Sequence, residues 1–173
     1  MLYVLIFVGI MAVACIATTN AVISSLWNAD QQGTQETIYT VDGDYNDFTL
    51  PAVCANVTGS SYASPASVAP VSPLTSAPSS PVLSITTRQS NLRLVITCNN
   101  PTELTTSYSN LTLSVFKRGS SAAVGTLNCL TSNELVYTLP IAGVYNFDYR
   151  FNYTSLNPGN ATINLNVNVL APS

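Results

Sequence analysis

The feature that most constrains this chain is the run from Met1 to Trp27, which contains no charged side chain. As a helix at ~1.5 Å per residue it reaches about 40 Å, and about 20 apolar residues suffice to span the ~30 Å hydrocarbon layer of a bilayer. Its apolar residues point in every direction around such a helix, so apolar material has to surround it. We therefore expect a hydrophobic helix over residues 1–30, buried in lipid or among copies of itself.

Three interpretations of this helix compete. A cleaved secretory signal normally carries Lys or Arg ahead of its apolar run, but here the run starts at Leu2 with no basic residue before it. A permanent single-pass anchor requires basic residues on a cytoplasmic flank, and the N-terminal side offers none. The third is a helix drawn from the membrane into the core of a filament. The arrangement of the whole chain favours the third and leaves the other two as alternatives.

The remaining residues, 31–173, are expected to form one β-rich outer domain. Period-two alternation predicts strands at residues 92–97, 111–116, 144–153 and 163–169, with others near 37–41, 47–53 and 135–139. Residues 59–81 are rich in Pro and Ser and are expected to form a long extended loop. The fold class predicted for the whole chain is α+β: the long helix followed by an immunoglobulin-like sandwich of seven or eight strands, with a barrel as the alternative.

Composition excludes nucleic acid as a partner. Only 8% of the residues are charged, the net charge is −3, and there is no histidine. A nucleic-acid surface needs clustered cations. The five basic residues are instead scattered over the sequence at Arg88, Arg93, Lys117, Arg118 and Arg150.

Four Asn-X-Ser/Thr sequons indicate an extracellular location. A single sequon is weak evidence in a chain this rich in Asn, Ser and Thr, and chance is the alternative explanation for all four. We expect N-linked glycans as the only non-protein groups and predict no other cofactor. The four candidate sites are Asn56, Asn110, Asn152 and Asn160.

Neither a metal site nor an active site is predicted. The acidic turn with Asp42, Asp44 and Asp47 has oxygen ligands at alternate positions. It lacks the twelfth-position glutamate of a helix-loop-helix calcium site, so we interpret it as a solvated turn. No spacing singles out a pair of carboxylates for glycosidase chemistry, and Lys117 is the only lysine. We therefore expect no catalytic residue and no small-molecule substrate.

Of the four cysteines, Cys15 lies in the apolar run and should stay a free thiol. Cys54, Cys98 and Cys129 permit at most one disulfide within a single outer domain, and their spacing without histidine excludes the usual zinc patterns. We predict a bridge from Cys98 to Cys129, with Cys54 to Cys98 as the alternative.

The predicted bridge depends on an expected meander of three strands that ends with both cysteines at the same end. The strands are expected near residues 90–98, 110–117 and 122–129. The middle strand would hold the cysteines roughly 10 Å apart, so the loops would have to bend inward to allow a disulfide.

An uncharged N-terminal helix followed by a Ser/Thr/Asn-rich β-domain with several sequons resembles the archaeal type IV pilins. The resemblance implies that a basic leader is removed ahead of the apolar run, which makes Met1 either the initiator or the first mature residue. Bacterial relatives carry a glutamate near position five, where Leu5 stands here.

The resemblance further implies a self-assembling extracellular filament whose subunits wait in the membrane before assembly. The residues expected to pack the helices together in the filament core are Leu5, Gly9, Ile10, Val13 and Ile16. The filament would serve adhesion, cell–cell contact or motility. The alternative is a single-pass surface or envelope glycoprotein, or a viral coat subunit.

Overall fold

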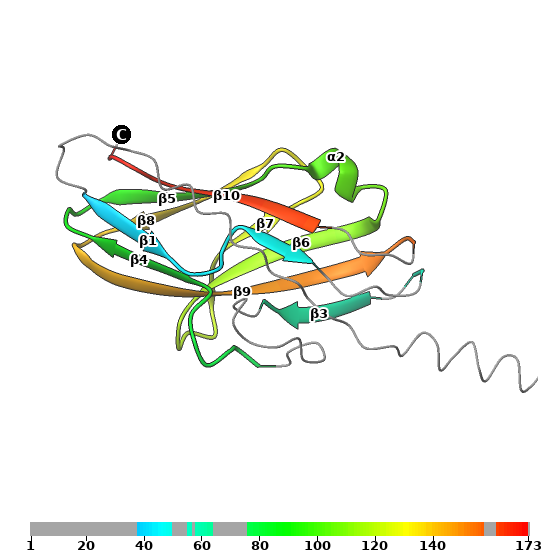
Figure 1. Cartoon of the computed structure of the whole chain (residues 1–173), viewed down its shortest axis with the longest axis horizontal. Helices are drawn as coiled ribbons and strands as arrows, with labels where there is room; N and C mark the ends of the chain where they lie inside the picture. Colours follow the sequence, from blue (N-terminus) through cyan, green and yellow to red (C-terminus); the bar gives the residue numbers. More distant parts are fainter. Residues whose placement is uncertain (1–37, 50–54, 57, 64–75, 158–161, 173) are drawn as a thin grey trace, which may run out of the picture.

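The computed structural model describes residues 38–49, 55–56, 58–63, 76–157 and 162–172. These residues form two antiparallel β-sheets packed face to face around one core (Figure 1). The expected helix over residues 1–30 lies outside the described residues, as do the five residues expected to pack it into a filament. Asn160, Cys15 and Cys54 lie outside them too.

The larger sheet has six strands, and the longest of them, β9 (Gly143–Ser155), runs through its middle. On one side β9 pairs with β6 (Tyr108–Lys117), which is followed by the edge strand β7 (Ala123–Asn128). On the other side it pairs with β4 (Leu83–Thr87) over its first half and β3 (Thr58–Tyr62) over its second half. Strand β1 (Tyr39–Asp42) pairs with β4 and forms the edge.

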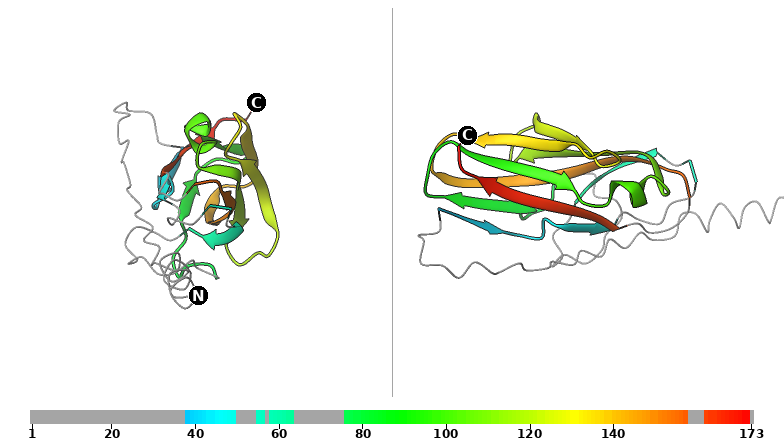
Figure 2. Two further views of the ribbon diagram at one scale, coloured as in Figure 1. Left: turned by 90° about the vertical axis from the view of Figure 1, so that its right-hand side faces the viewer. Right: turned by 90° about the horizontal axis from the view of Figure 1, so that it is seen from above.

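The smaller sheet has four strands in the order β2 (Asp47–Thr49), β10 (Thr162–Leu170), β5 (Leu92–Cys98) and β8 (Glu134–Leu139). Seen from above, β10, β5 and β8 lie over the larger sheet as the red, green and yellow strands of Figure 2. The four-residue helix α2 (Pro101–Leu104) follows β5. Along the described strands the chain therefore changes sheets at every step except from β3 to β4 and from β6 to β7.

The predicted α+β class is wrong for this structure, because the described residues form an all-β domain. Their one helix is α2, a single turn that begins at a proline and buries only Leu104. No helix in the described part of the chain is long and apolar enough to cross a membrane. The described residues contain ten strands, more than the predicted seven or eight, and the two segments at which no strand was predicted are β3 and β4.

The sandwich also departs from immunoglobulin topology. In an immunoglobulin domain the first strand pairs with the second, and the last pairs with the penultimate one, inside the same sheets. We compare the seven strands β4 to β10 with the seven of an immunoglobulin domain. Here the first of them, β4, pairs with β9, and the last, β10, pairs with β5. The two outer partners are thus exchanged between sheets, while the pairings β9–β6–β7 and β5–β8 keep the familiar order. Alternation along a strand reveals its buried face but not its partner, which is why the sequence did not disclose this exchange.

The core follows the alternation that the sequence predicts. Successive side chains of a strand point to opposite faces of a sheet. Along β9 the odd positions from 145 to 153 are all aromatic and all buried. Phe48 of β2 packs against two of these rings, with centroids 5.7 Å from Tyr149 and 5.4 Å from Phe151. The aromatic side of β9 therefore faces the smaller sheet and fills the space between the sheets.

Strand β3 occupies the beginning of the stretch that was expected to be a loop. It contains Gly59, whose position explains why so small a residue stands in this strand. A Cβ atom there would lie 2.6 Å from the ring of Tyr153 on β9. The close approach of β3 to this ring therefore requires glycine.

Candidate functional site

Two of the predicted glycosylation sequons face each other across neighbouring strands. In the pairing of β6 with β9, Asn110 lies opposite Thr154, and Thr112 lies opposite Asn152. Each sequon therefore sets its asparagine beside the threonine of the other. All four residues occupy even positions, whereas the buried side chains at this end are the odd ones, both in β9 and in β6 beyond the register shift between Tyr108 and Asn110. The two sequons share the outer face of the larger sheet.

The third described sequon reaches the same face from β3. Its threonine, Thr58, pairs with Thr154, and the two hydroxyl oxygens are 2.9 Å apart. Its asparagine, Asn56, is exposed, and its backbone N–H donates to the carbonyl oxygen of Ser155 at 2.7 Å. We call the surface made by these three sequons the sequon face: Asn56, Thr58, Asn110, Thr112, Asn152 and Thr154.

The sequence correctly placed Asn110 and Asn152 on the polar parity of their strands. Asn110 is exposed and Asn152 is half-buried. Sequence reasoning missed that the three sequons converge, because only the register between β3, β9 and β6 brings them together. Positions that far apart in sequence carry no signal of this register. The fourth site, Asn160, is not among the described residues.

Further along the same outer face, polar and aromatic side chains replace the sequons. Arg150 of β9 donates from Nε to the hydroxyl of Ser60 at 2.6 Å, and its guanidinium lies 5.6 Å from the ring centroid of Tyr62. The Tyr62 ring in turn lies 6.4 Å from that of Phe116. These contacts connect β3, β9 and β6 on the solvent side and hold the three strands in register.

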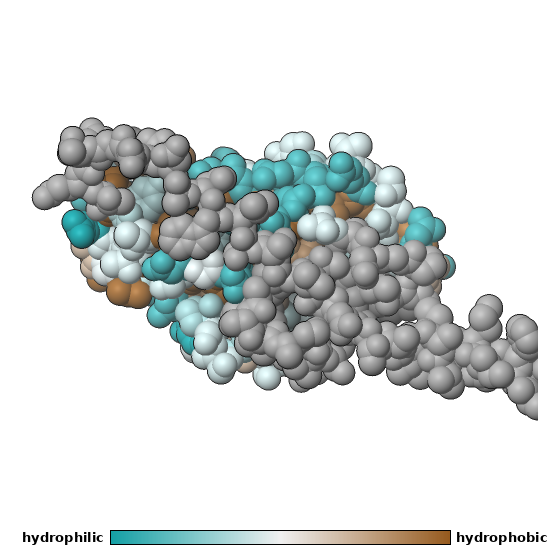
Figure 3. All heavy atoms as spheres, in the orientation of Figure 1, coloured by the Kyte–Doolittle hydropathy of each residue, from teal (hydrophilic) through white to brown (hydrophobic). Residues whose placement is uncertain are grey.

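A slot of about 680 Å³ opens on another part of the molecule, between β1 and β10. Its walls come from β1, from the acidic turn at residues 42–47 and from β10. Asn164, Asn166 and Asn168 contribute amide groups, and none of the lining residues is basic. Figure 3 shows hydrophilic residues gathered over β10 and α2. The described lining thus combines amide and hydroxyl groups with the carboxylates of Asp42 and Asp47.

The groups at the slot are partly removed from water. Burial raises the pKa of Tyr45, and the nearby Asp42 and Tyr39 raise it further. Burial also raises the pKa of Asp47. Asn46, which lines the slot as well, has a buried side-chain oxygen with no hydrogen-bond partner in the described part of the chain. Among the described residues no group of three or more acidic or sulfur side chains is placed to hold a metal ion.

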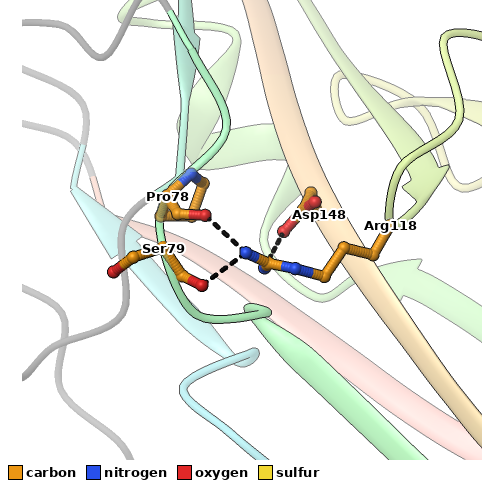
Figure 4. Close-up of polar contacts among 4 residues, drawn as sticks. All are labelled: Pro78, Ser79, Arg118 and Asp148. Atoms are coloured by element: carbon orange, nitrogen blue, oxygen red, sulfur yellow. Dashed lines mark hydrogen bonds and ion pairs between the residues drawn. The ribbon is translucent and has the colours of Figure 1, made fainter.

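An ion pair connects the end of β6 to β9 in the larger sheet. Arg118, just after β6, contacts the carboxylate of Asp148 on β9 at 3.1 Å (Figure 4). The same guanidinium donates to the backbone oxygens of Pro78, at 2.8 Å, and Ser79. Burial raises the pKa of Asp148 above its ordinary value, and the Arg118 charge offsets part of that rise. The cluster ties the segment just ahead of β4 to β6 and β9.

The two cysteines predicted to pair lie together in the core, although not for the predicted reason. The expected meander is wrong, because β5 belongs to the smaller sheet while β6 and β7 belong to the larger one. Cys98 ends β5 and Cys129 follows β7, so the two thiols approach each other across the sandwich. Both are buried free thiols, and each shifts the pKa of the other. The bridge between them stays a prediction.

Comparison of the chain with protein-family models and with curated proteins gave no match.

Proposed function

We propose that this chain is the structural subunit of an extracellular, pilus-like filament. The observation that carries the proposal is the combination of two unlike parts. An uncharged apolar run of 27 residues is joined to a β-sandwich with a glycosylatable outer face. The first part requires apolar surroundings and the second requires water, and a filament with an apolar centre and a hydrated outside satisfies both.

Assembly by the apolar run costs little free energy in this proposal. A subunit held in the bilayer exchanges lipid for the apolar runs of other copies, so no apolar surface has to enter water. The sandwich stays outside and presents the sequon face to solvent. Its surface supports this, because Asn and Thr occupy four of the five outer positions of β10 and three of the six of β9, and only 8% of the chain's residues are charged.

The test is electron microscopy of native material, which should contain helical filaments. A charge in the apolar run should abolish them, because neighbouring copies cannot solvate it and burial of an unpaired carboxylate costs several kcal/mol. The variant is Ile10→Asp. A matched control is Ile141→Asp, which places the same charge on a side chain that is 67% exposed in the sandwich.

The expected result is loss of filaments with Ile10→Asp and normal filaments with Ile141→Asp. Normal filaments from both variants would reject assembly through the apolar run. Isolated particles or membrane-bound single subunits in the native material would favour the alternative, a single-pass surface glycoprotein, over the filament.

A further inference from the structure

We propose that Cys98 and Cys129 form a disulfide that joins the two sheets, in which Cys98 attacks the oxidant and Cys129 then resolves the mixed disulfide. The proposal does not depend on the filament. It requires only that a disulfide-type oxidant, such as oxidised glutathione, reach the folded domain.

The backbone around each thiol is fixed before any bond forms. The N–H of Cys129 donates to the carbonyl oxygen of Leu111 at 2.9 Å, which ties the end of β7 to β6. Beyond Cys98, the Asn100 side chain donates to the backbone oxygen of Thr162 at 2.8 Å and accepts from the N–H of Asn164 at 3.2 Å. Because the backbone beside both thiols is held in this way, we expect bond formation to rotate the two side chains and to leave the strands in place.

The two thiols differ in access and in acidity. Cys98 is 7% exposed at the end of its strand, whereas Cys129 is fully buried. Cys98 also donates from Sγ to the side-chain oxygen of Asn100 at 3.8 Å. Interaction with the Cys129 side chain lowers the pKa of Cys98, burial raises it, and the backbone groups of Asn100 and Asn99 lower it, with a net lowering. Interaction with Cys98, together with burial, raises the pKa of Cys129. The thiolate is the attacking species in exchange reactions, so the first step belongs to Cys98.

The reaction is a thiol–disulfide exchange in two steps. The Cys98 thiolate attacks one sulfur of the oxidant, its S–S bond breaks, and one thiolate leaves. Cys129 loses its proton to solvent and attacks the Cys98 sulfur, so that the second thiolate leaves and the Cys98–Cys129 bond forms. The protein gives up two electrons and two protons, and the oxidant is reduced to two thiols.

Trypsin separates the relevant cysteines, because the chain has so few cleavage sites. Cys98 falls in the peptide from Leu94 to Lys117, and Cys129 in that from Gly119 to Arg150. Cys15 and Cys54 both remain in the peptide from Met1 to Arg88. After incubation of the purified full chain with oxidised glutathione, the first two peptides should be linked in a non-reducing map. A link between Leu94–Lys117 and Met1–Arg88, or alkylation of Cys98 and Cys129 as free thiols, would overturn the pairing.

The order of attack is tested with single variants under the same conditions. Cys129→Ala should accumulate a glutathione adduct on the Leu94–Lys117 peptide, because the resolving thiol is gone. Cys98→Ala should leave the Gly119–Arg150 peptide unmodified. An adduct on Cys129 in Cys98→Ala would overturn the assigned order. If a variant does not fold, the map of the unsubstituted chain still decides the pairing. Its reduction should lower Tm by roughly 10 °C, given a closed loop of about 30 residues.

Discussion

The hydroxyl of Tyr145 makes two hydrogen bonds to the backbone of Ile141. It donates to the carbonyl oxygen at 2.7 Å and accepts from the N–H at 3.1 Å. Tyr145 stands near the start of β9, and Ile141 lies in the turn that leads from β8 into that strand. The contact resembles the tyrosine corner of immunoglobulin domains, in which a tyrosine hydroxyl bonds to backbone a few residues upstream. It fixes the crossing from the smaller sheet to the larger one.

This contact predicts opposite results for phenylalanine substitutions at different tyrosines. Tyr145→Phe should lower the free energy of unfolding by about 1 kcal/mol, because it removes two satisfied hydrogen bonds. Tyr149→Phe should leave stability unchanged or raise it by about 1 kcal/mol. The reason is that the Tyr149 hydroxyl is buried without a hydrogen-bond partner among the described residues. Urea unfolding of the full chain measures both, and equal destabilisation by the two substitutions would contradict the assignment.

Mild acid should stabilise the sandwich through Asp148. Burial raises the folded-state pKa of this carboxyl above its ordinary 3.8. The folded state therefore keeps the proton at pH values where the unfolded chain has released it, so the free energy of unfolding falls as pH rises from about 3.8 through the folded pKa. Asp47 contributes with the same sign, since burial raises its pKa too.

The matched variant for this pH effect is Asp148→Asn. The quantity to compare is the slope of the free energy of unfolding against pH, and not the stability at a single pH. The substitution weakens the contact with Arg118, but it should flatten the decline of stability that begins above the ordinary carboxyl pKa of 3.8. Chemical denaturation at a series of pH values measures the slope. A variant with an undiminished slope would show that other groups cause the dependence.

The acidic turn between β1 and β2 should tolerate no side chain at Gly43. This residue has φ of 109°, and a Cβ atom would lie 2.3 Å from the carbonyl oxygen of Val82. Gly43→Ala should therefore cost about 3 kcal/mol. Gly119→Ala is the control, because Gly119 has φ of 80° but no atom within 4 Å of its Cβ position. Gly119→Ala should lower the free energy of unfolding by about 1 kcal/mol. A similar loss for Gly43→Ala would show that the positive φ, and not the contact with Val82, causes the destabilisation.

At least two of the four sequons should carry glycans in the native source. Intact mass spectrometry should then give a mass above the 18.3 kDa of the bare chain. Asn110→Gln and Asn152→Gln each remove one candidate site on the sequon face and should each reduce that mass if the site is occupied. The bare polypeptide mass in native material would refute the prediction.

The sequence predicted the faces of the strands better than their partners. The aromatic odd positions of β9 and the Asn-Val alternation of β10 specified which side chains are buried, because the side-chain period of a strand is two. Strand β3 was missed because Gly59, Ser60 and Ser61 carry no apolar pattern. The meeting of Cys98 with Cys129 was expected through a meander, but it arises from the packing of two sheets. Pairing between distant strands depends on tertiary contacts that local patterns do not encode.

The pairing of β2 with β10 sets an order in which the domain can form. Among the described residues β2 pairs only with β10, and no other two paired strands lie so far apart in the sequence. Contacts between distant segments form late, because the entropy of closing the intervening chain has to be overcome first. We therefore expect β2, the strand of the smaller sheet nearest to the apolar run, to dock after the rest of the sandwich has assembled. Until β10 has been synthesised, the smaller sheet has no place for β2, so this strand completes its sheet at the end of folding.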